Sequence, residues 1–140
     1  MVKRVLIIGG YGNFGAYIAK KLSVETDIQV IVGGRNTEKA QAFVSTISSG
    51  PNKPQWQQMD YSSNLSGVLE SVRPDIVIHT SGPFQGQGYD VARQCINAGC
   101  HYIDLADARD FVTGITELDK SAKEQDVMVV SGASSVPCLT

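Results

Sequence analysis

Short apolar runs alternate with longer segments of helical period along almost the whole chain. Each run is rich in branched residues and ends in glycine or polar residues, a pattern typical of buried strands. The six predicted strands are RVLIIG (4–9), IQVIVGG (28–34), PQWQQMD (54–60), DIVIHTSG (75–82), HYIDLA (101–106) and VMVVSG (127–132).

The segments between the strands carry apolar residues at the spacing of one helix face. Turn-forming stretches end these segments, as in SSGPNKP after the second predicted helix and NAGC after the fourth. Three sets of positions follow the spacing i, i+3, i+4 and i+7 or close to it: Ala40, Phe43, Val44 and Ile47; Leu65, Val68, Leu69 and Val72; and Phe111, Ile115, Leu118 and Ala122.

Regular alternation of strands and helices predicts right-handed crossovers and a parallel sheet with helices on both faces. We therefore predict an α/β fold of Rossmann type, which is a doubly wound six-stranded parallel sheet with strand order 3-2-1-4-5-6. The 140 residues contain no internal repeat or linker, so residues 1–140 are expected to form one domain.

Composition narrows the class of protein. A net charge of −2 argues against nucleic acid as a partner. No apolar run approaches the roughly 18 residues needed to cross a bilayer, so a membrane partner is not expected. The first strand begins close to Met1, which predicts no targeting peptide and a cytoplasmic location. Cys95, Cys100 and Cys138 lack CxxC spacing, which indicates reduced thiols and no metal site.

The first strand runs into GGYGNFG (9–15), which opens the first predicted helix. Gly10, Gly12 and Gly15 form a GxGxxG motif in the strand–turn–helix context that dinucleotide-binding domains use. Gly10 is expected to allow the tight turn, Gly12 the approach of a pyrophosphate, and Gly15 close packing of helix and strand. The amides of Asn13 and Phe14 would then point at the phosphates. A glycine turn with a purely structural role is the alternative.

The end of the second strand indicates which dinucleotide binds. Arg35 lies 20 residues after Gly15, where NAD-binding domains carry an acid, and the strand ends IVGGRN with no acid. A guanidinium pairs with a 2′-phosphate, so NADP is preferred over NAD. Gly33 and Gly34 are expected to leave room for the 2′-phosphate to approach Arg35, and Asn36 is expected to add a hydrogen-bond donor to it. The alternative is that Arg35 is only a solvated charge.

Further ligand contacts are expected at the carboxyl ends of the third and fourth strands. Asp60 closes the third strand and is expected to accept a hydrogen bond from the adenine amino group. Ser81, Gly82 and Pro83 follow the fourth strand, near the expected pyrophosphate and nicotinamide ribose. Glycine and proline are also ordinary turn formers there.

Several other chemical groups have ordinary structural explanations. Tyr17 and Lys21 form a YxxxK spacing, but it falls in the first helix, away from the expected nicotinamide. His79 and His101 are expected to be satisfied structural histidines. Cys138 has no base to activate it.

Carboxylates follow the fifth strand. Asp104 and Asp107 leave this strand at the binding edge, where a carboxylate could orient a substrate amine. Capping of the next helix by Asp107 or Asp110 is the preferred explanation for those two residues. The catalytic residues are therefore unknown from the sequence.

Four stretches resemble the NADP-binding domain of the saccharopine dehydrogenase-like oxidoreductases. They carry a GP-aromatic turn, an AG-aliphatic-tyrosine-aspartate strand and a small-residue SxP segment, here Ser135 to Pro137. The loop IDLADARDF departs from the glycine and glutamate of many relatives, so it does not indicate a substrate. The stretches are GGYGNFG (9–15), GGRNTEKA (33–40), GPFQGQGYDVARQCINAGCHYIDLADARDFV (82–112) and VVSGASSVP (129–137).

This resemblance implies hydride transfer with NADP, at a carbon–nitrogen bond of an amino-acid-like substrate. It also implies that the chain is the N-terminal part of a longer protein, because relatives continue into a substrate-binding and dimerising domain. The 140 residues alone are then expected to be inactive, and the longer protein to form a homodimer. A noncatalytic dinucleotide-binding or regulatory module is the alternative.

Overall fold

All six predicted strands are present in the computed structural model, which describes residues 1–47 and 50–133. The expectations for Ser135, Pro137 and Cys138 lie outside these residues. The strands are β1 (Lys3–Ile8), β2 (Ile28–Gly34), β3 (Gln55–Gln58), β4 (Ile76–His79), β5 (His101–Asp104) and β6 (Val129–Val130).

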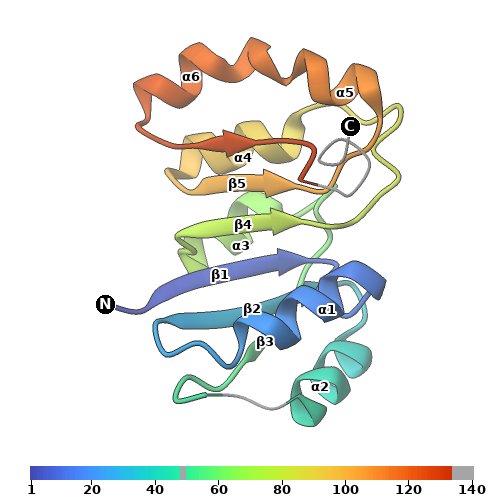
Figure 1. Cartoon of the computed structure of the whole chain (residues 1–140), viewed down its shortest axis with the longest axis vertical. Helices are drawn as coiled ribbons and strands as arrows, with labels where there is room; N and C mark the ends of the chain where they lie inside the picture. Colours follow the sequence, from blue (N-terminus) through green and yellow to red (C-terminus); the bar gives the residue numbers. More distant parts are fainter. Residues whose placement is uncertain (48–49, 134–140) are drawn as a thin grey trace.

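The strands form one parallel sheet in the order β3-β2-β1-β4-β5-β6 (Figure 1), so the predicted fold class and strand order are confirmed. The chain starts in the middle of the sheet, builds outward to β3, and then returns across β1 to begin the other half at β4. The helices between the strands are α1 (Asn13–Leu22), α2 (Thr37–Thr46), α3 (Leu65–Val72), α4 (Asp90–Ala98), α5 (Arg109–Gly114) and α6 (Asp119–Glu124).

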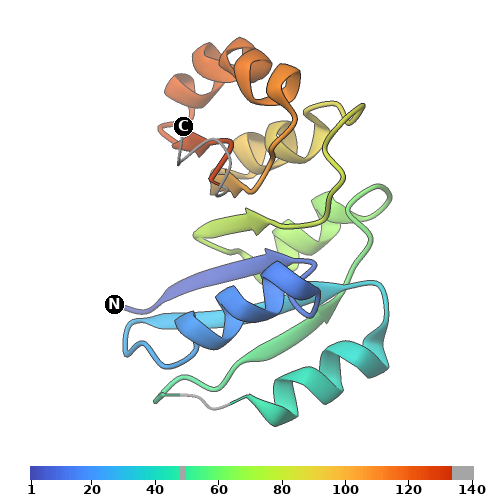
Figure 2. The same cartoon turned by 45° about the vertical axis from the view of Figure 1, so that its right-hand side comes forward.

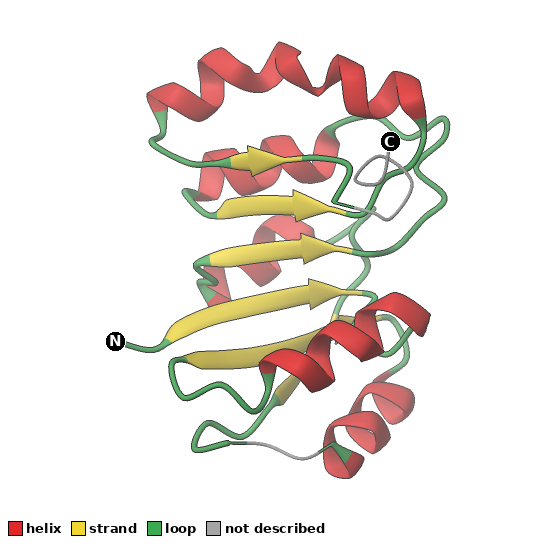
Figure 3. Ribbon diagram, in the orientation of Figure 1, coloured by secondary structure: helices red, strands yellow, loops and turns green. Residues whose placement is uncertain are grey.

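Two hydrophobic layers sandwich the sheet, because side chains alternate along each strand. From β1, Leu6 and Ile8 point into a layer with α3, α4 and α6. Val5 and Ile7 point into the opposite layer, with α1 and α2. Figure 3 shows α1 in front of the sheet and α3 and α4 behind it. Burial on both faces explains why β1 is an unbroken apolar run rather than an alternating one.

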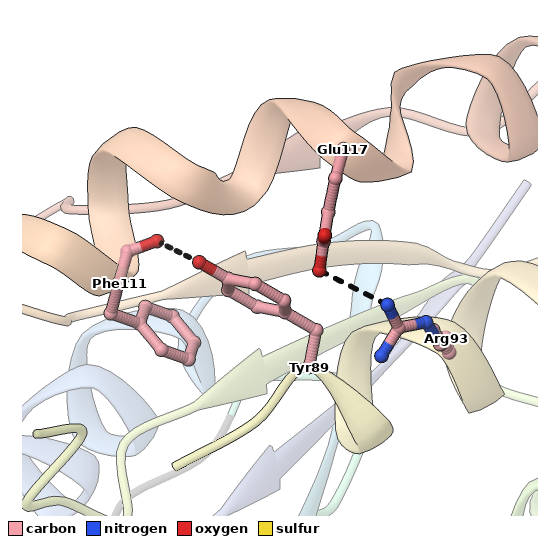
Figure 4. Close-up of polar contacts among 4 residues, drawn as sticks. All are labelled: Tyr89, Arg93, Phe111 and Glu117. Atoms are coloured by element: carbon pink, nitrogen blue, oxygen red, sulfur yellow. Dashed lines mark hydrogen bonds and ion pairs between the residues drawn. The ribbon is translucent and has the colours of Figure 1, made fainter. Parts of the chain in front are cut away.

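The segment between β5 and β6 differs from the helix that its periodicity predicts. The helix is interrupted by a 3₁₀ turn, Ile115–Leu118, between α5 and α6. Tyr89 donates its hydroxyl hydrogen to the Phe111 carbonyl, at an oxygen–oxygen distance of 2.8 Å (Figure 4). The Tyr89 hydroxyl fits here because Gly114 has no side chain; a Cβ at Gly114 would lie 2.5 Å from the hydroxyl oxygen. A tertiary hydrogen bond to the backbone of α5 thus accompanies the change to a 3₁₀ turn.

The same junction carries an ion pair between Arg93 of α4 and Glu117, with a nitrogen–oxygen distance of 3.0 Å (Figure 4). Both side chains are about half exposed, so the pair contributes little to stability. In the described part of the chain, no helix is long and apolar enough to span a membrane.

Candidate cofactor-binding site

A cleft of about 490 Å³ opens at the carboxyl edge of the sheet, beside the N-terminus of α1. Figure 2 shows this end of α1 at the same edge as the tips of β1 and β4. Ligands of open α/β sheets bind at this edge, where the strand order reverses between β1 and β4. The cleft is lined by Ile8, Gly9, Tyr11, Gly12, Asn13, Phe14, Gly15, Gly34, Arg35, Met59, Asp60, Tyr61, Ser62, Thr80, Ser81 and Gly82.

Gly9 makes the tight turn after β1. Its φ of +79° lies in the left-handed region that favours glycine. A Cβ there would also lie 2.6 Å from the Ser81 hydroxyl oxygen, so the loop after β4 can approach only a bare backbone. The sequence predicted that Gly10 allows this turn, and Gly10 lies in the turn directly after Gly9 but without a left-handed φ. Gly10 is buried, and its missing side chain makes room for the Ile7 carbonyl and Val32.

Gly12 and Gly15 lie where the motif predicts them. Gly12 precedes α1 as its N-cap, and a Cβ at this position would contact only the Gly9 carbonyl oxygen, at 3.3 Å. Gly15 is buried in the first turn of α1, where a Cβ would collide with the same carbonyl oxygen. Gly12 therefore leaves the cleft open, and Gly15 allows α1 to pack directly on the turn.

The N-terminus of α1 offers backbone donors to the cleft. Asn13 and Phe14 are its first residues, and the first amides of a helix have no carbonyl within the helix to bond. Gly12 has no side chain to cap them, and the first turn of α1, which the structure describes completely, contains no acidic residue. This helix end is suited to an anion.

Arg35 lies at the other side of the cleft, exposed, directly after β2. The sequence predicted that the two glycines before Arg35 clear the approach of a ligand. In the structure, side chains of the protein fill the space that these glycines leave. A Cβ at Gly34 would collide with the ring of Tyr11, and one at Gly33 would lie 2.6 Å from the Met59 sulfur.

Asn36 has a structural role and does not line the cleft. It is the N-cap of α2, and its side-chain oxygen accepts a hydrogen bond from the Lys39 amide at 2.9 Å. Its own amide donates to the Tyr11 hydroxyl at 3.1 Å. The backbone amide of Asn36 is thus already used, and its side-chain oxygen serves as the cap of α2.

Asp60 presents a carboxylate at the end of the cleft. Its oxygen accepts hydrogen bonds from the Ser62 hydroxyl, at 2.6 Å, and from the Ser62 amide, at 3.0 Å. These two hydrogen bonds, followed by the charge of Arg35, lower the pKa of Asp60. The group is therefore an ionised acceptor, suited to an amino group.

The loop after β4 closes the cleft on its third side. The Thr80 hydroxyl donates to the Ile8 carbonyl at 2.7 Å, which ties this loop to the end of β1. Ser81 and Gly82 line the cleft, as expected, whereas Pro83 lines a second depression of about 690 Å³ that includes Phe84.

The sequence analysis missed several residues of the cleft. Tyr11 occupies a variable position of the glycine motif, and Tyr61 and Ser62 follow Asp60. Thr80 directly follows β4, at the edge of the sheet where the sequence predicts ligand binding. Tyr11 could have been found from its place inside the motif.

The family model of the saccharopine dehydrogenase NADP-binding domain matches residues 5–130. The chain belongs to this family. The predicted recognition is confirmed, and NADP is the cofactor for which the family is named, in agreement with the preference for NADP over NAD.

Curated relatives of this NADP-binding domain include trans-acting enoyl reductases of mycobacteria. The protein of Mycobacterium leprae is 24% identical over 139 residues, which cover 95% of this chain and 33% of that protein. The protein of Mycobacterium bovis strain BCG has the same identity and coverage. The chain thus spans about a third of the length of the curated relatives it matches.

Two solved structures share the fold. Saccharopine dehydrogenase (L-Glu forming) from Saccharomyces cerevisiae superposes with a TM-score of 0.70 at 22% identity, over 94% of this chain and 27% of that chain. An actinorhodin polyketide ketoreductase in complex with NADPH superposes with a TM-score of 0.70 at 14% identity, over 93% and 69% of the two chains. At these identities the likeness shows the fold alone.

His79 lies deep in this NADP-binding domain, at the end of β4 and 1% exposed. Its Nδ1 accepts a long hydrogen bond from the Ser81 amide, at 3.4 Å, and its ring packs between Tyr61 and Phe84, each 4.9 Å away between centroids. Its Nε2 has no hydrogen-bond partner in the described residues. Burial lowers the pKa of His79 to about 4. The histidine is structural as predicted, but it is not satisfied.

Asp104 is fully buried and faces inward. Its carboxylate accepts hydrogen bonds from the Tyr102 hydroxyl at 2.7 Å, the Ala106 amide at 3.0 Å, the Ser131 hydroxyl at 2.9 Å and the Gly132 amide at 2.9 Å. These bonds occupy the carboxylate that the sequence offered to a substrate amine, so Asp104 holds the end of β5 to the chain after β6.

The predicted capping of α5 by Asp107 or Asp110 is wrong. Ala108 occupies the N-cap position, and its side chain makes no capping hydrogen bond. Asp107 is exposed and lines the second depression, whereas Asp110 is in the first turn of the helix. A carboxylate in a first turn still interacts favourably with the helix dipole, which explains its place there without a cap.

The remaining groups that the sequence suggested lie away from the cofactor cleft. Lys21 places its Nζ 5.5 Å from the ring centroid of Tyr17, which is 64% exposed, so the YxxxK pair does not line the cleft. His101 accepts a hydrogen bond from the Met128 amide at 2.9 Å and is structural. Cys95 and Cys100 are buried free thiols.

Proposed function

We propose that NADP binds along the cleft, with its pyrophosphate at the N-terminus of α1 and its adenosine half toward Arg35 and Asp60. One observation carries the proposal: an uncapped helix N-terminus and an exposed guanidinium line the same cleft, after two neighbouring strands. Both are groups that bind phosphate, and a 2′-phosphorylated dinucleotide has a pyrophosphate for the helix end and a 2′-phosphate for the guanidinium.

The residues of the cleft fit this cofactor. Gly12 leaves a bare backbone against which the pyrophosphate can lie, and the amides of Asn13 and Phe14 donate to its oxygens. Arg35 forms a bidentate pair with the 2′-phosphate. Gly15 supports the site indirectly, because it allows α1 to approach the turn.

The two ends of the cleft receive the two bases. Asp60, whose pKa is lowered by Ser62, accepts a hydrogen bond from the adenine amino group. Ser81 and Gly82 lie beside the nicotinamide ribose. Gly10, Asn36 and Pro83 make no direct contact with the cofactor here, because Gly10 is buried against Ile7 and Val32, Asn36 caps α2 and Pro83 lines the second depression.

We also propose that this domain is the N-terminal part of a longer oxidoreductase and turns over no substrate alone. When bound, NADP supplies hydride transfer. The chain spans about a third of its curated relatives, which leaves room in such proteins for the residues that bind substrate. Catalytic residues are therefore not assigned to this chain.

Two substrate classes are candidates. The resemblance to saccharopine dehydrogenase-like enzymes favours a carbon–nitrogen bond of an amino-acid-like substrate. The trans-acting enoyl reductases, which match 95% of this chain, favour a carbon–carbon double bond instead. Turnover of an imine-forming amino acid or of an enoyl thioester by the longer protein would distinguish them, and turnover of neither would favour a regulatory module.

Calorimetric titration of this chain with NADPH and NADH, at one ionic strength, tests the binding proposal. We expect tighter binding of NADPH, and we expect Arg35→Asp to remove the preference. Loss of a hydrogen bond to a charged group costs about 1.5–3 kcal/mol, or roughly ten- to hundredfold in affinity, and the new carboxylate repels the phosphate. NADH affinity should change much less.

Arg73→Asp is the matched control, because it makes the same change of charge at an exposed residue at the opposite edge of the sheet. Arg73 has a φ of +52°, a conformation that aspartate tolerates. If Arg35→Asp and Arg73→Asp weaken NADPH equally, net charge explains the effect and Arg35 is not in the site.

A further inference from the structure

Tyr11 joins the two phosphate-binding parts of the cleft. It belongs to the glycine turn after β1, and its ring lies on Gly34 at the end of β2, where any Cβ would collide with it. Tyr11, Gly34 and Arg35 all line the cleft. The ring thus reaches from the pyrophosphate side of the proposed site to the side that carries the guanidinium.

The Tyr11 hydroxyl is fixed at the start of α2. Its oxygen accepts a hydrogen bond from the Asn36 amide at 3.1 Å, and Asn36 directly follows Arg35. The hydroxyl oxygen is therefore held beside the backbone of the residue whose side chain would pair with the 2′-phosphate. Asn36 is in turn fixed by its own capping bond to Lys39.

The hydrogen of this hydroxyl has no acceptor in the part of the chain that the structure describes, residues 1–47 and 50–133. A tyrosine hydroxyl is both donor and acceptor, and here the acceptor side is used by the Asn36 amide. The remaining donor is therefore available to a ligand. An O–H donor to an anionic oxygen forms a stronger hydrogen bond than one to a neutral oxygen.

We propose that Tyr11 is a specificity residue for the dinucleotide, whose hydroxyl donates a hydrogen bond to the 2′-phosphate beside Arg35. The inference rests on the proposed NADP site and adds a second, neutral contact to the same phosphate. It also explains Gly34, because only glycine there lets the tyrosine ring cross from one turn to the other.

Tyr11→Phe tests the inference, because it removes the hydroxyl and keeps the ring on Gly34. The variant and the wild-type chain are titrated with NADPH and NADH in parallel. We expect the affinity for NADPH to fall roughly tenfold or more, as a hydrogen bond to a charged group is lost, and that for NADH to change by about threefold or less. Tyr17→Phe, at an exposed tyrosine that does not line the cleft, should change neither affinity.

The outcomes separate this inference from the binding proposal. If wild-type chain prefers NADPH and Tyr11→Phe keeps the same ratio of affinities, Tyr11 is not a specificity residue, while the NADP site stands. An equal loss for both cofactors also overturns the inference, since the hydroxyl then serves the shared part of the molecule. If the folded wild-type chain binds neither cofactor or shows no preference, the binding proposal fails and the inference fails with it.

A second measurement needs no variant. The Tyr11 ¹³Cζ resonance of tyrosine-labelled wild-type chain should shift on addition of adenosine 2′,5′-bisphosphate and much less on addition of adenosine 5′-monophosphate. These probes differ by the 2′-phosphate alone and lack nicotinamide. Equal shifts with both, at saturation, would overturn the inference even if Tyr11→Phe failed to fold.

Discussion

His79 is the residue at which folding leaves a polar atom without a partner in the described chain. The imidazole packs against Tyr61, Phe84 and Tyr102, and its Nε2 has no hydrogen-bond partner within residues 1–47 and 50–133. Burial of such a group costs free energy, and the cost increases when the ring is charged. The residue is therefore neutral in the folded chain, consistent with a pKa lowered to about 4.

Replacement of His79 by phenylalanine should remove part of the acid sensitivity of the fold. Between pH 6.5, the ordinary value, and about 4, the unfolded chain binds a proton at this residue and the folded chain does not. Stability therefore falls as the pH is lowered through this range, by up to about 3 kcal/mol from His79 alone. Urea denaturation at pH 4, 5, 6 and 7 should show a shallower pH dependence for His79→Phe than for wild type. Parallel curves for the two proteins would contradict the assignment.

At the scale of elements, α1 packs directly on the turn after β1. The Gly9 carbonyl accepts a hydrogen bond from the Gly12 amide at 2.9 Å and lies against the bare Cα of Gly15. A side chain at residue 15 would force α1 away from the sheet and move the amides of Asn13 and Phe14. The binding geometry thus depends on one helix-to-turn contact.

Gly15→Ala and Gly67→Ala form a matched pair within two helices. Gly15→Ala should destabilise the chain by about 1–3 kcal/mol, because the added methyl overpacks the contact with Gly9. Gly67 lies in α3 with no atom within 4 Å of its Cβ position, so Gly67→Ala should stabilise the chain by about 0.5–1 kcal/mol. Thermal and urea denaturation measure both. A stabilising effect of Gly15→Ala would show that the turn can move without cost.

At the scale of the whole molecule, the sheet is held very differently at its centre and at its β6 edge. Six residue pairs join β1 to β2, whereas β6 pairs with β5 only through Val129 and Val130. Asp104 supplements this short pairing with hydrogen bonds to Ser131 and Gly132. The attachment of the β6 edge therefore depends on a buried carboxylate as well as on strand pairing.

Asp104→Asn should loosen the β6 edge before the centre of the sheet. The amide keeps one acceptor oxygen and turns an NH₂ group toward donors, so we expect the free energy of unfolding to fall by about 2–4 kcal/mol. Amide hydrogen exchange should increase first in β5 and β6 and less in β1 and β2. Asp107→Asn, at an exposed residue, should change the free energy of unfolding by less than about 0.5 kcal/mol. Uniformly faster exchange over all six strands would show that the sheet opens as one unit.

Features that depend on local pattern could be predicted from the sequence. Contacts between segments that are distant in the chain could not. The strands, their order and the glycine turn after β1 follow from periodicity and spacing. The contact of Tyr11 with Gly34 and that of Tyr89 with Gly114 join segments remote in the chain, so no local pattern shows them. Burial likewise separates Asp104, turned inward, from the exposed Asp107 three residues later.

The central position of β1 has a consequence during synthesis. This strand leaves the ribosome before the other five strands of the sheet and pairs with β2 early, but its other neighbour is β4, where Val5 pairs with Ile76. At 5–20 residues per second, β4 follows about 4–14 s later. Until then the β1 backbone has an unpaired edge, and Leu6 and Ile8, which end 0% and 2% exposed, lie on a face of the half-built sheet that α4 and α6 do not yet cover. In this interval the chain is open to capture by chaperones, or to pairing with another unfinished copy.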